Sequence, residues 1–205
     1  QGRLFHSQQW EHDYDLSGKR VAVIGTGASA IQFVPQIQPK VARLDLYQRT
    51  PPWIMPKPDR AISAREQRLF RRYPALQKLW RGGIYTFLEA RVLGFAISPH
   101  ILRMASLVAR HHLRRQVRDP ELRRKLTPDY VMGCKRVLIS NDYYPALAQP
   151  NVEVITDGIQ EVREHSIVTA DGTEREIDAI IFGTGFMPTD PIPRGVIFGR
   201  GGVDL

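Results

Sequence analysis

A short run of small residues in this 205-residue chain has the types and spacing that hold a pyrophosphate. Residues 25–30 read G-T-G-A-S-A, the pattern G-x-G-x-x-A, directly after the apolar run VAVI. In this pattern the first glycine permits a tight turn, the second lets the backbone approach the phosphates, and a small last residue lets helix and strand pack closely. The motif predicts a dinucleotide site that uses Gly25, Thr26, Gly27, Ala28 and Ser29. A glycine-rich turn that binds no ligand is the alternative.

The end of the next predicted strand indicates which dinucleotide this site prefers. NAD, or the adenosine of FAD, calls for an Asp or Glu there to accept hydrogen bonds from the ribose hydroxyls. This chain has Gln48-Arg49-Thr50 instead. An arginine suits a 2′-phosphate, because each charge-assisted bond contributes roughly 1.5–3 kcal/mol. Asp45 lies in mid-strand and is expected to be structural. The prediction is therefore NADP(H), bound in part by Arg49 and Thr50.

The residues offer no separate apparatus for using NADPH. A short-chain dehydrogenase needs a Tyr-x-x-x-Lys pair, but Lys135 follows Tyr130 at one position too many. No Cys/His cluster has the spacing of a metal site, so no bound metal is expected. The single cysteine, Cys134, excludes an internal disulfide and suits a cytoplasmic location.

Positive charge is concentrated in one part of the chain. Residues 57–125 carry 17 Lys or Arg against 5 Asp or Glu, whereas the net charge of the whole chain is +8. No zinc-finger or RNA-binding signature accompanies this excess, so nucleic acid is not expected as a partner. An arginine-rich solvated helical face is the simplest interpretation, and contact with a membrane surface or with another domain stays open.

The elements that must position the motif residues alternate between strand and helix. Residues 19–52 predict a strand, a tight turn, a helix shortened or kinked by Pro35, and a second strand. From Val137 strands return, with a hairpin around Asp171-Gly172 and a buried strand in AIIFGTGF. This order predicts an α/β, Rossmann-like domain with a parallel sheet and a β-hairpin.

A helical subdomain is predicted to interrupt this domain. Its three or four helices occupy residues 59–127, and capping signals occur at Ser63, Ser98 and Asp119. Pro74 and the pair Gly82-Gly83 are expected to interrupt the helical pattern.

Three further groups of residues carry a family resemblance. Gly2, His6 and Trp10 match the last part of the pattern F-x-G-x-x-x-H-x-x-x-W. The segment GCKRVLISNDYYPAL contains the pair Lys135-Arg136, and DAIIFGTGF ends in a second glycine-rich turn. Together they resemble the class B flavoprotein monooxygenases, and within these the Baeyer–Villiger monooxygenases. The run RTPPW and the helical insertion look most like the branch that acts on aryl ketones such as hydroxyacetophenones.

This resemblance implies an oxidoreductase that uses NADPH and FAD to insert one oxygen atom of O2 into a ketone, giving an ester. Arg136 would be the catalytic residue that stabilises developing oxyanion charge, and Lys135 would join the 2′-phosphate contacts. Gly183, Thr184 and Gly185 would contact cofactor in the second glycine-rich turn. The family's FAD domain would lie on the same polypeptide outside this chain, which alone would lack the FAD site and full activity.

The same reading divides the chain into four parts. Residues 1–18 would be an interdomain linker, 19–58 and 128–188 the NADP-binding domain, 59–127 the helical insertion, and 189–205 a return toward the FAD domain. Two other functions stay open: a monooxygenase of the same class that oxygenates nitrogen or sulfur, and a non-catalytic NADP-binding module.

Overall fold

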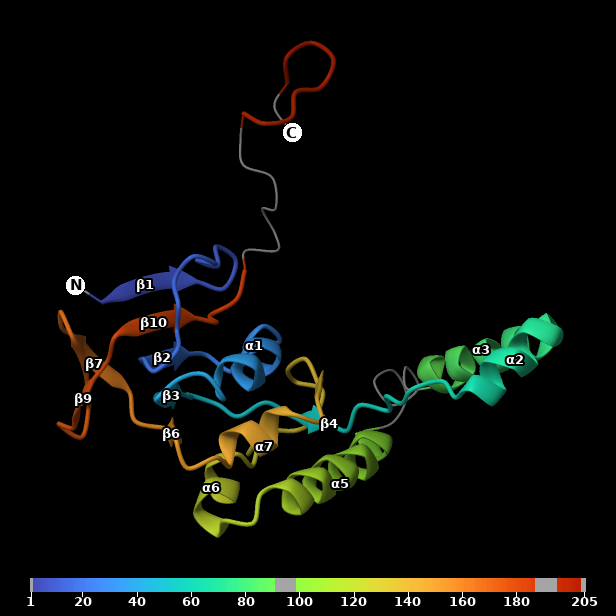
Figure 1. The fold of residues 1–205 in the computed structure, drawn as a ribbon, viewed down its shortest axis with the longest axis horizontal. Helices are drawn as coiled ribbons and strands as arrows, with labels where there is room; N and C mark the ends of the chain where they lie inside the picture. The colour runs from blue at the N-terminus through green and yellow to red at the C-terminus, as the bar shows by residue number, and fades with distance from the viewer. Residues whose placement is uncertain (1, 91–98, 187–194, 204–205) are drawn as a thin grey trace.

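A five-stranded sheet in which every neighbouring pair is parallel forms the centre of the molecule. The computed structural model describes residues 2–90, 99–186 and 195–203. In spatial order the strands are β1 (Arg3–His6), β10 (Ala179–Phe182), β2 (Arg20–Ile24), β3 (Arg43–Tyr47) and β6 (Val152–Ile155). The chain runs from β2 to β3 to β6 in one direction and returns to β10 on the other side of β2 (Figure 1). The predicted α/β fold with a parallel sheet is confirmed.

Helices cover one face of this sheet. They are α1 (Ala30–Ile37) and α7 (Tyr143–Leu147), and the C-terminal part of α5 (Pro99–Gln116) packs against α7. Helix α1 buries Ile31, Val34 and Ile37, as their spacing predicts, and Pro35 lies within its eight residues. Burying such a side chain contributes about 1.5–3 kcal/mol, so this apolar face fixes how α1 lies on the strands.

An antiparallel meander covers the opposite face. It consists of β7 (Ile159–Val162), β8 (Ser166–Thr169) and β9 (Glu174–Glu176). Ile167 and Ile177 pack there against Ala22, Tyr47 and Ile180 of the sheet. The predicted hairpin is formed by β8 and β9, and Gly172 in its turn has φ 81°. β7, the third strand of the meander, lies outside the hairpin that the sequence predicts.

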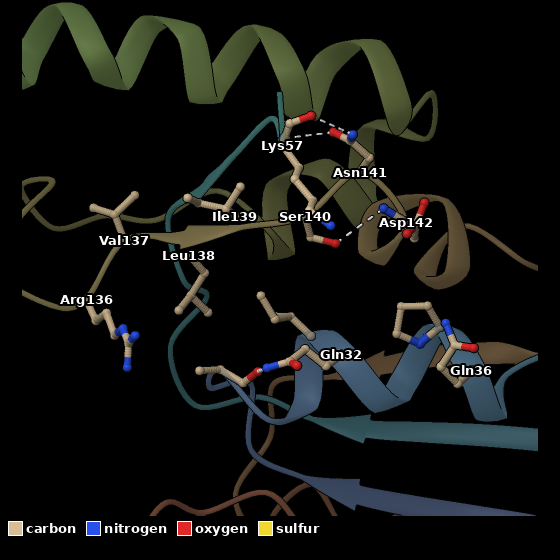
Figure 2. A pocket seen from close by; sticks show the side chains of 13 residues that line it. Gln32, Gln36, Lys57, Arg136, Val137, Leu138, Ile139, Ser140, Asn141 and Asp142 are labelled. Carbon is tan, nitrogen blue, oxygen red and sulfur yellow. Dashed lines mark hydrogen bonds between the residues drawn. The ribbon is translucent and has the colours of Figure 1, made fainter. Parts of the chain in front are cut away.

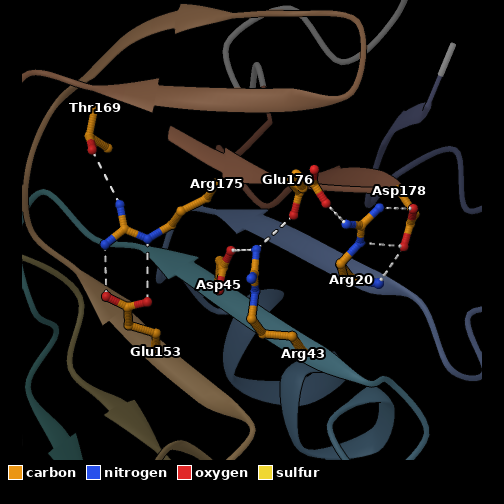
Figure 3. A network of polar contacts seen from close by, with 8 residues as sticks. All are labelled: Arg20, Arg43, Asp45, Glu153, Thr169, Arg175, Glu176 and Asp178. Carbon is orange, nitrogen blue, oxygen red and sulfur yellow. Dashed lines mark hydrogen bonds and ion pairs between the residues drawn. The ribbon is translucent and has the colours of Figure 1, made fainter. Parts of the chain in front are cut away.

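Ion pairs connect neighbouring strands of the sheet and connect the meander to the sheet (Figure 3). The Arg20 guanidinium donates to both carboxylate oxygens of Asp178, at 2.8 and 3.1 Å, and also to Glu176. The Arg175 guanidinium bridges β9 to β6 by donating to Glu153 at 2.8 Å. The bonds from Arg20 to Asp178 hold the amino ends of β2 and β10 next to each other, and the bond from Arg175 to Glu153 holds the meander to the edge strand β6.

The helical insertion divides into a projecting part and a packed part. Helices α2 (Ala64–Arg72) and α3 (Pro74–Glu89) extend away from the sheet (Figure 1) and bury none of their side chains. By contrast, Leu113 of α5 is buried in the main core, as are Val117 just after α5 and Leu126 just after α6 (Pro120–Lys125). The charged helices of the insertion therefore do not form one uniform surface.

The local helix signals are largely confirmed. Ser63 and Glu66 form a reciprocal capping box, and the Asp119 carboxylate accepts from the amides of Glu121 and Leu122. One detail of the prediction is wrong: α3 continues through Gly82-Gly83. A glycine within a helix lowers its stability by only about 1 kcal/mol relative to alanine, so the helical residues on both sides are enough to keep Gly82-Gly83 helical.

Part of the predicted organisation falls outside the described residues. The cap at Ser98 and residues 189–194 and 204–205 of the predicted return segment lie there. In the described ranges, no helix combines the length and apolar character needed to cross a bilayer.

The N-terminal residues, predicted as a linker, form the edge strand β1 beside β10. A side chain at Gly2 would meet the carbonyl oxygen of Asp178 at 3.0 Å, so a larger residue would push β1 from the sheet. The Trp10 ring packs at 5.3 Å against both Phe5 of β1 and Phe33 of α1. Gly2 and Trp10 of the N-terminal pattern therefore attach this segment to the parallel sheet and to α1.

Candidate nucleotide site

The carboxyl ends of β2, β3 and β10 bring three loops together. The Gly25 amide donates to the Tyr47 carbonyl at 3.1 Å, and the Gly183 amide donates to the Ile24 carbonyl at 2.8 Å. Thr26 Oγ1 donates to the Thr50 carbonyl at 3.2 Å, which ties the first glycine loop to the loop after β3. The strand order reverses between β2 and β10, and in open α/β sheets ligands bind at such a point.

A cavity of about 770 Å³ opens at this edge of the sheet. Every residue that the sequence predicts as a cofactor contact lines it: Gly25, Thr26, Gly27, Ala28, Ser29, Arg49, Thr50, Lys135, Gly183, Thr184 and Gly185. Arg136 lines it as well. These residues come from four separate parts of the sequence, and the fold places them around one space. Their roles toward a cofactor stay predictions.

The two glycine-rich turns meet directly in the floor of the cavity. Gly25 has φ 108°, and a Cβ there would lie 2.5 Å from the Gly183 carbonyl oxygen. A Cβ on Gly183 would in turn lie 3.5 Å from the Cβ of Ala30. The first glycine of the motif therefore permits the contact between the turns, and a side chain at Gly25 would separate them, whereas the distance between Gly183 and Ala30 is an ordinary packing contact.

The second glycine and the start of α1 offer the features that a pyrophosphate needs. A Cβ on Gly27 would meet only the Gly183 carbonyl oxygen, at 3.9 Å, so its backbone can be approached closely. Among the described residues, none accepts a hydrogen bond from the amides of Gly27, Ala28 or Ser29. Free amide donors before a helix carry partial positive charge and bind phosphate oxygens. The residues present therefore fit the diphosphate of a dinucleotide.

Cationic side chains line the same cavity. Arg49 and Lys135 are exposed, and Thr50 is half-buried beside Arg49. Asp45 does not line the cavity: it is buried on the meander side of β3, where Arg43 donates to its carboxylate at 3.0 Å. Burial raises the pKa of Asp45. Without an accessible acid at the end of β3, the loop suits a phosphate better than a ribose diol.

Arg136 lies where this cavity adjoins a second one. The second pocket, of about 440 Å³, lies between α1 and β5 (Leu138–Ile139) and shares Ala28, Arg136 and Leu138 with the first. In Figure 2 the Arg136 guanidinium points away from β5, and no dashed bond joins it to the other residues drawn. A fixed cation at this boundary can meet negative charge on a group bound in the cavity.

β5 holds the pair Lys135-Arg136 in place. It pairs in parallel with β4 (Ile54–Met55), which directly follows the Arg49 loop and Trp53. The Leu138 amide donates to the Trp53 carbonyl at 2.8 Å. This short ladder connects the two ends of the helical insertion. It therefore places Lys135 at the same cavity as Arg49, although the two residues are 86 positions apart in the sequence.

The structure adds two aromatic residues that sequence reasoning did not assign to the site. Tyr130 and Phe186 both line the cavity. The Phe186 ring lies edge-on to the His6 ring at 5.7 Å between centroids, so it joins β1 to the turn after β10. Position alone gives a signal for Phe186, directly after the GTG turn, whereas Tyr130 stands out only through its nearness to Lys135.

The sequence profile of the flavin-binding monooxygenase-like family matches residues 1–193, most of the chain. The chain belongs to this family. It is 67% identical over all of its 205 residues to a Baeyer–Villiger monooxygenase of Pseudomonas aeruginosa, covering 39% of that protein. It is 56% identical over 96% of its length to a Baeyer–Villiger monooxygenase of Streptomyces coelicolor, covering 38% of that protein. The resemblance stated from the sequence motifs is confirmed.

Solved structures of similar proteins have the same fold. A cyclohexanone monooxygenase from Rhodococcus sp. Phi1 bound to NADP+ aligns with a TM-score of 0.78 and 26% identity, over 100% of this chain and 45% of its own. An ε-caprolactone-bound cyclohexanone monooxygenase aligns with a TM-score of 0.77 over 99% of this chain and 47% of its own. The chain thus spans about two-fifths of the length of the curated relatives it matches.

Proposed function

We propose that this chain is the NADP(H)-binding part of an FAD-dependent monooxygenase. The observation that carries the proposal is the convergence of the glycine turns, the start of α1, Arg49 and Lys135 on one cavity. Free amides at Gly27, Ala28 and Ser29 would hold the diphosphate. Arg49, Thr50 and Lys135 would hold the 2′-phosphate, which distinguishes NADPH from NADH.

We further propose that the full-length protein converts a ketone to an ester with O2 and NADPH. Relatives that are 67% and 56% identical bear the name Baeyer–Villiger monooxygenase, which supports this reaction class. When bound, FAD supplies the oxygen-transfer chemistry after NADPH has reduced it. In this chain, Arg136 would face that chemistry from the rim of the cavity and stabilise negative charge on oxygen.

Product analysis tests the proposed reaction. The purified full-length protein should be yellow with a flavin spectrum, and with NADPH, ¹⁸O2 and an aryl ketone it should release an ester carrying one ¹⁸O atom. Oxidation of an amine or sulfide in place of the ketone would favour the heteroatom-oxygenating alternative. A persistently colourless protein would support the non-catalytic NADP-binding module and contradict both enzyme assignments.

A further inference from the structure

The ring of Tyr130 forms part of the cavity wall and faces a cation. Lys135 Nζ lies 4.9 Å from the centroid of the Tyr130 ring. Both residues line the cavity together with Arg49 and Thr50. A cation this close to an aromatic face is attracted by the electron-rich face of the ring.

The position of the Tyr130 ring is fixed by its surroundings. Trp53, which is 3% exposed, donates from Nε1 to the Tyr130 carbonyl at 3.0 Å. The Trp53 and Tyr130 rings meet edge to face, with centroids 6.5 Å apart. Trp53 in turn belongs to a small apolar cluster with Ala109 and Met132. Tyr130 is therefore anchored by backbone and ring to the packed part of the insertion.

A tight turn brings Lys135 back over this ring. The Cys134 amide donates to the Val131 carbonyl at 3.2 Å, and Gly133 has φ 103°, a value that few other residues adopt. The turn reverses the chain between Tyr130 and Lys135. The spacing of five residues, which does not suit a dehydrogenase pair, suits this stacked arrangement.

Lys135 needs such a support to act as a selective phosphate contact. Its side chain is exposed, and a long lysine loses up to about 2 kcal/mol of rotamer freedom when it is held in one position. A ring face that already restrains the Lys135 ammonium in the free protein reduces the conformational entropy that this side chain loses when a ligand binds. A carboxylate would do the same but would also neutralise the charge that a phosphate requires.

We propose that Tyr130 is a positioning residue for recognition of the 2′-phosphate, acting by holding the Lys135 ammonium against the cavity wall. This inference rests on the proposed NADP(H) function of the cavity. It assigns Tyr130 no part in proton transfer, and it predicts that the ring face, and not the hydroxyl group, carries the effect.

Calorimetric titration of the full-length protein with 2′,5′-ADP and with 5′-AMP tests this role. Tyr130→Leu should weaken 2′,5′-ADP binding about two- to fivefold and leave 5′-AMP binding unchanged. Tyr130→Phe should bind both ligands as the original protein does. Lys135→Met should remove the effect of Tyr130→Leu, because the two residues act through one contact.

A second pair of variants keeps the ring's shape and changes only its charge distribution. Pentafluorophenylalanine at position 130 should weaken 2′,5′-ADP binding relative to Tyr130→Phe, since fluorine withdraws electron density from the ring face. Equal binding by these two variants would overturn the inference, as would equal loss of both ligands in Tyr130→Leu, which would assign the ring to the adenosine. Equal binding of 2′,5′-ADP and 5′-AMP by the original protein would contradict the proposed NADP(H) function itself. This outcome differs from the two results that would overturn the role of Tyr130 alone.

Discussion

At the scale of single residues, Arg49 and Lys135 bring positive charge to one cavity from loops that lie far apart in the sequence. Neither cation is buried, so each can bind and release a phosphate without a large desolvation cost. Selectivity for the 2′-phosphate should therefore depend on several moderate contacts and not on one strong one.

Removal of Arg49 tests this distribution of charge. Arg49→Ala should lower the preference for NADPH over NADH by roughly 10- to 100-fold, because charged hydrogen bonds of about 1.5–3 kcal/mol are lost. The ratio of kcat/KM for the two cofactors in the full-length protein gives the measurement. Arg60→Ala is a matched control, since Arg60 is exposed, pairs with Glu66 and does not line the cavity. An unchanged ratio in Arg49→Ala would rule out the assignment.

Removal of Arg136 separates nucleotide binding from oxygen transfer. Arg136→Ala in the full-length protein should still oxidise NADPH but form ester about 10²- to 10³-fold more slowly, because a group that stabilises oxyanion charge is lost. Parallel measurement of NADPH consumption and ester yield shows the difference. An ester yield equal to that of the original protein would exclude Arg136 from catalysis.

Residues that line the cavity could be predicted from the sequence where the backbone conformation permits only certain residue types. Gly25, Gly27 and Ala30 could be found because a tight turn and a close helix–strand contact restrict the residue type. Tyr130 could not, because its place in the cavity wall depends on Gly133 turning the chain and on Trp53 donating to its carbonyl. Such contacts depend on tertiary packing, which residue spacing does not encode.

At the scale of elements, the two glycine turns after β2 and β10 are in direct contact, so a change in one should affect the stability of both. Gly25→Ala should destabilise the fold by several kcal/mol, since the new Cβ would lie 2.5 Å from the Gly183 carbonyl and φ is positive. Gly27→Ala is the matched control, because space is available there; it should melt normally but bind NADP+ more weakly. Thermal melts and NADP+ titrations of both variants distinguish the two roles. Similar stability in both variants would contradict the contact between turns.

The start of β10 carries an acid-sensitive contact. Hydrogen bonds from Arg20 lower the pKa of Asp178 to about 2. Because the folded pKa lies below the unfolded value of about 3.9, the ionised carboxylate stabilises the fold at higher pH, and this contribution is lost as pH falls from about 4 to 2. Asp178→Asn should lower the free energy of unfolding by about 1 kcal/mol near neutral pH and should reduce its decrease between about pH 4 and pH 2. Urea unfolding between pH 2 and pH 6 measures it, and parallel curves for both proteins would contradict the contact.

Elements with strong local signals could be predicted, and those held mainly by distant neighbours could not. The buried strands β2, β3 and β10 and the capped helices α2 and α6 have clear patterns. The segment of β1 is only four residues long, and its pairing depends on β10, which comes more than 170 positions later. The ladder of β4 and β5 has two residues per strand, too few for any periodicity.

At the scale of the whole molecule, the described residues present the candidate nucleotide cavity at the carboxyl edge of a parallel sheet, and a helical hairpin of α2 and α3 that extends away from the sheet (Figure 1). The chain spans 38–39% of the length of its Pseudomonas and Streptomyces relatives. In our proposal, this part of the full-length protein supplies the NADP(H) contacts, and Arg136 supplies one contact with the oxygen chemistry.

Equilibrium titration of the full-length protein with NADP+ and NAD+ tests whether this cavity binds NADP(H). The two ligands differ only by the 2′-phosphate, so the ratio of their dissociation constants isolates the contribution of Arg49, Thr50 and Lys135. We expect NADP+ to bind at least tenfold more tightly than NAD+, corresponding to about 1.4 kcal/mol. Equal affinities, or tighter binding of NAD+, would contradict the assignment of this cavity to NADP(H).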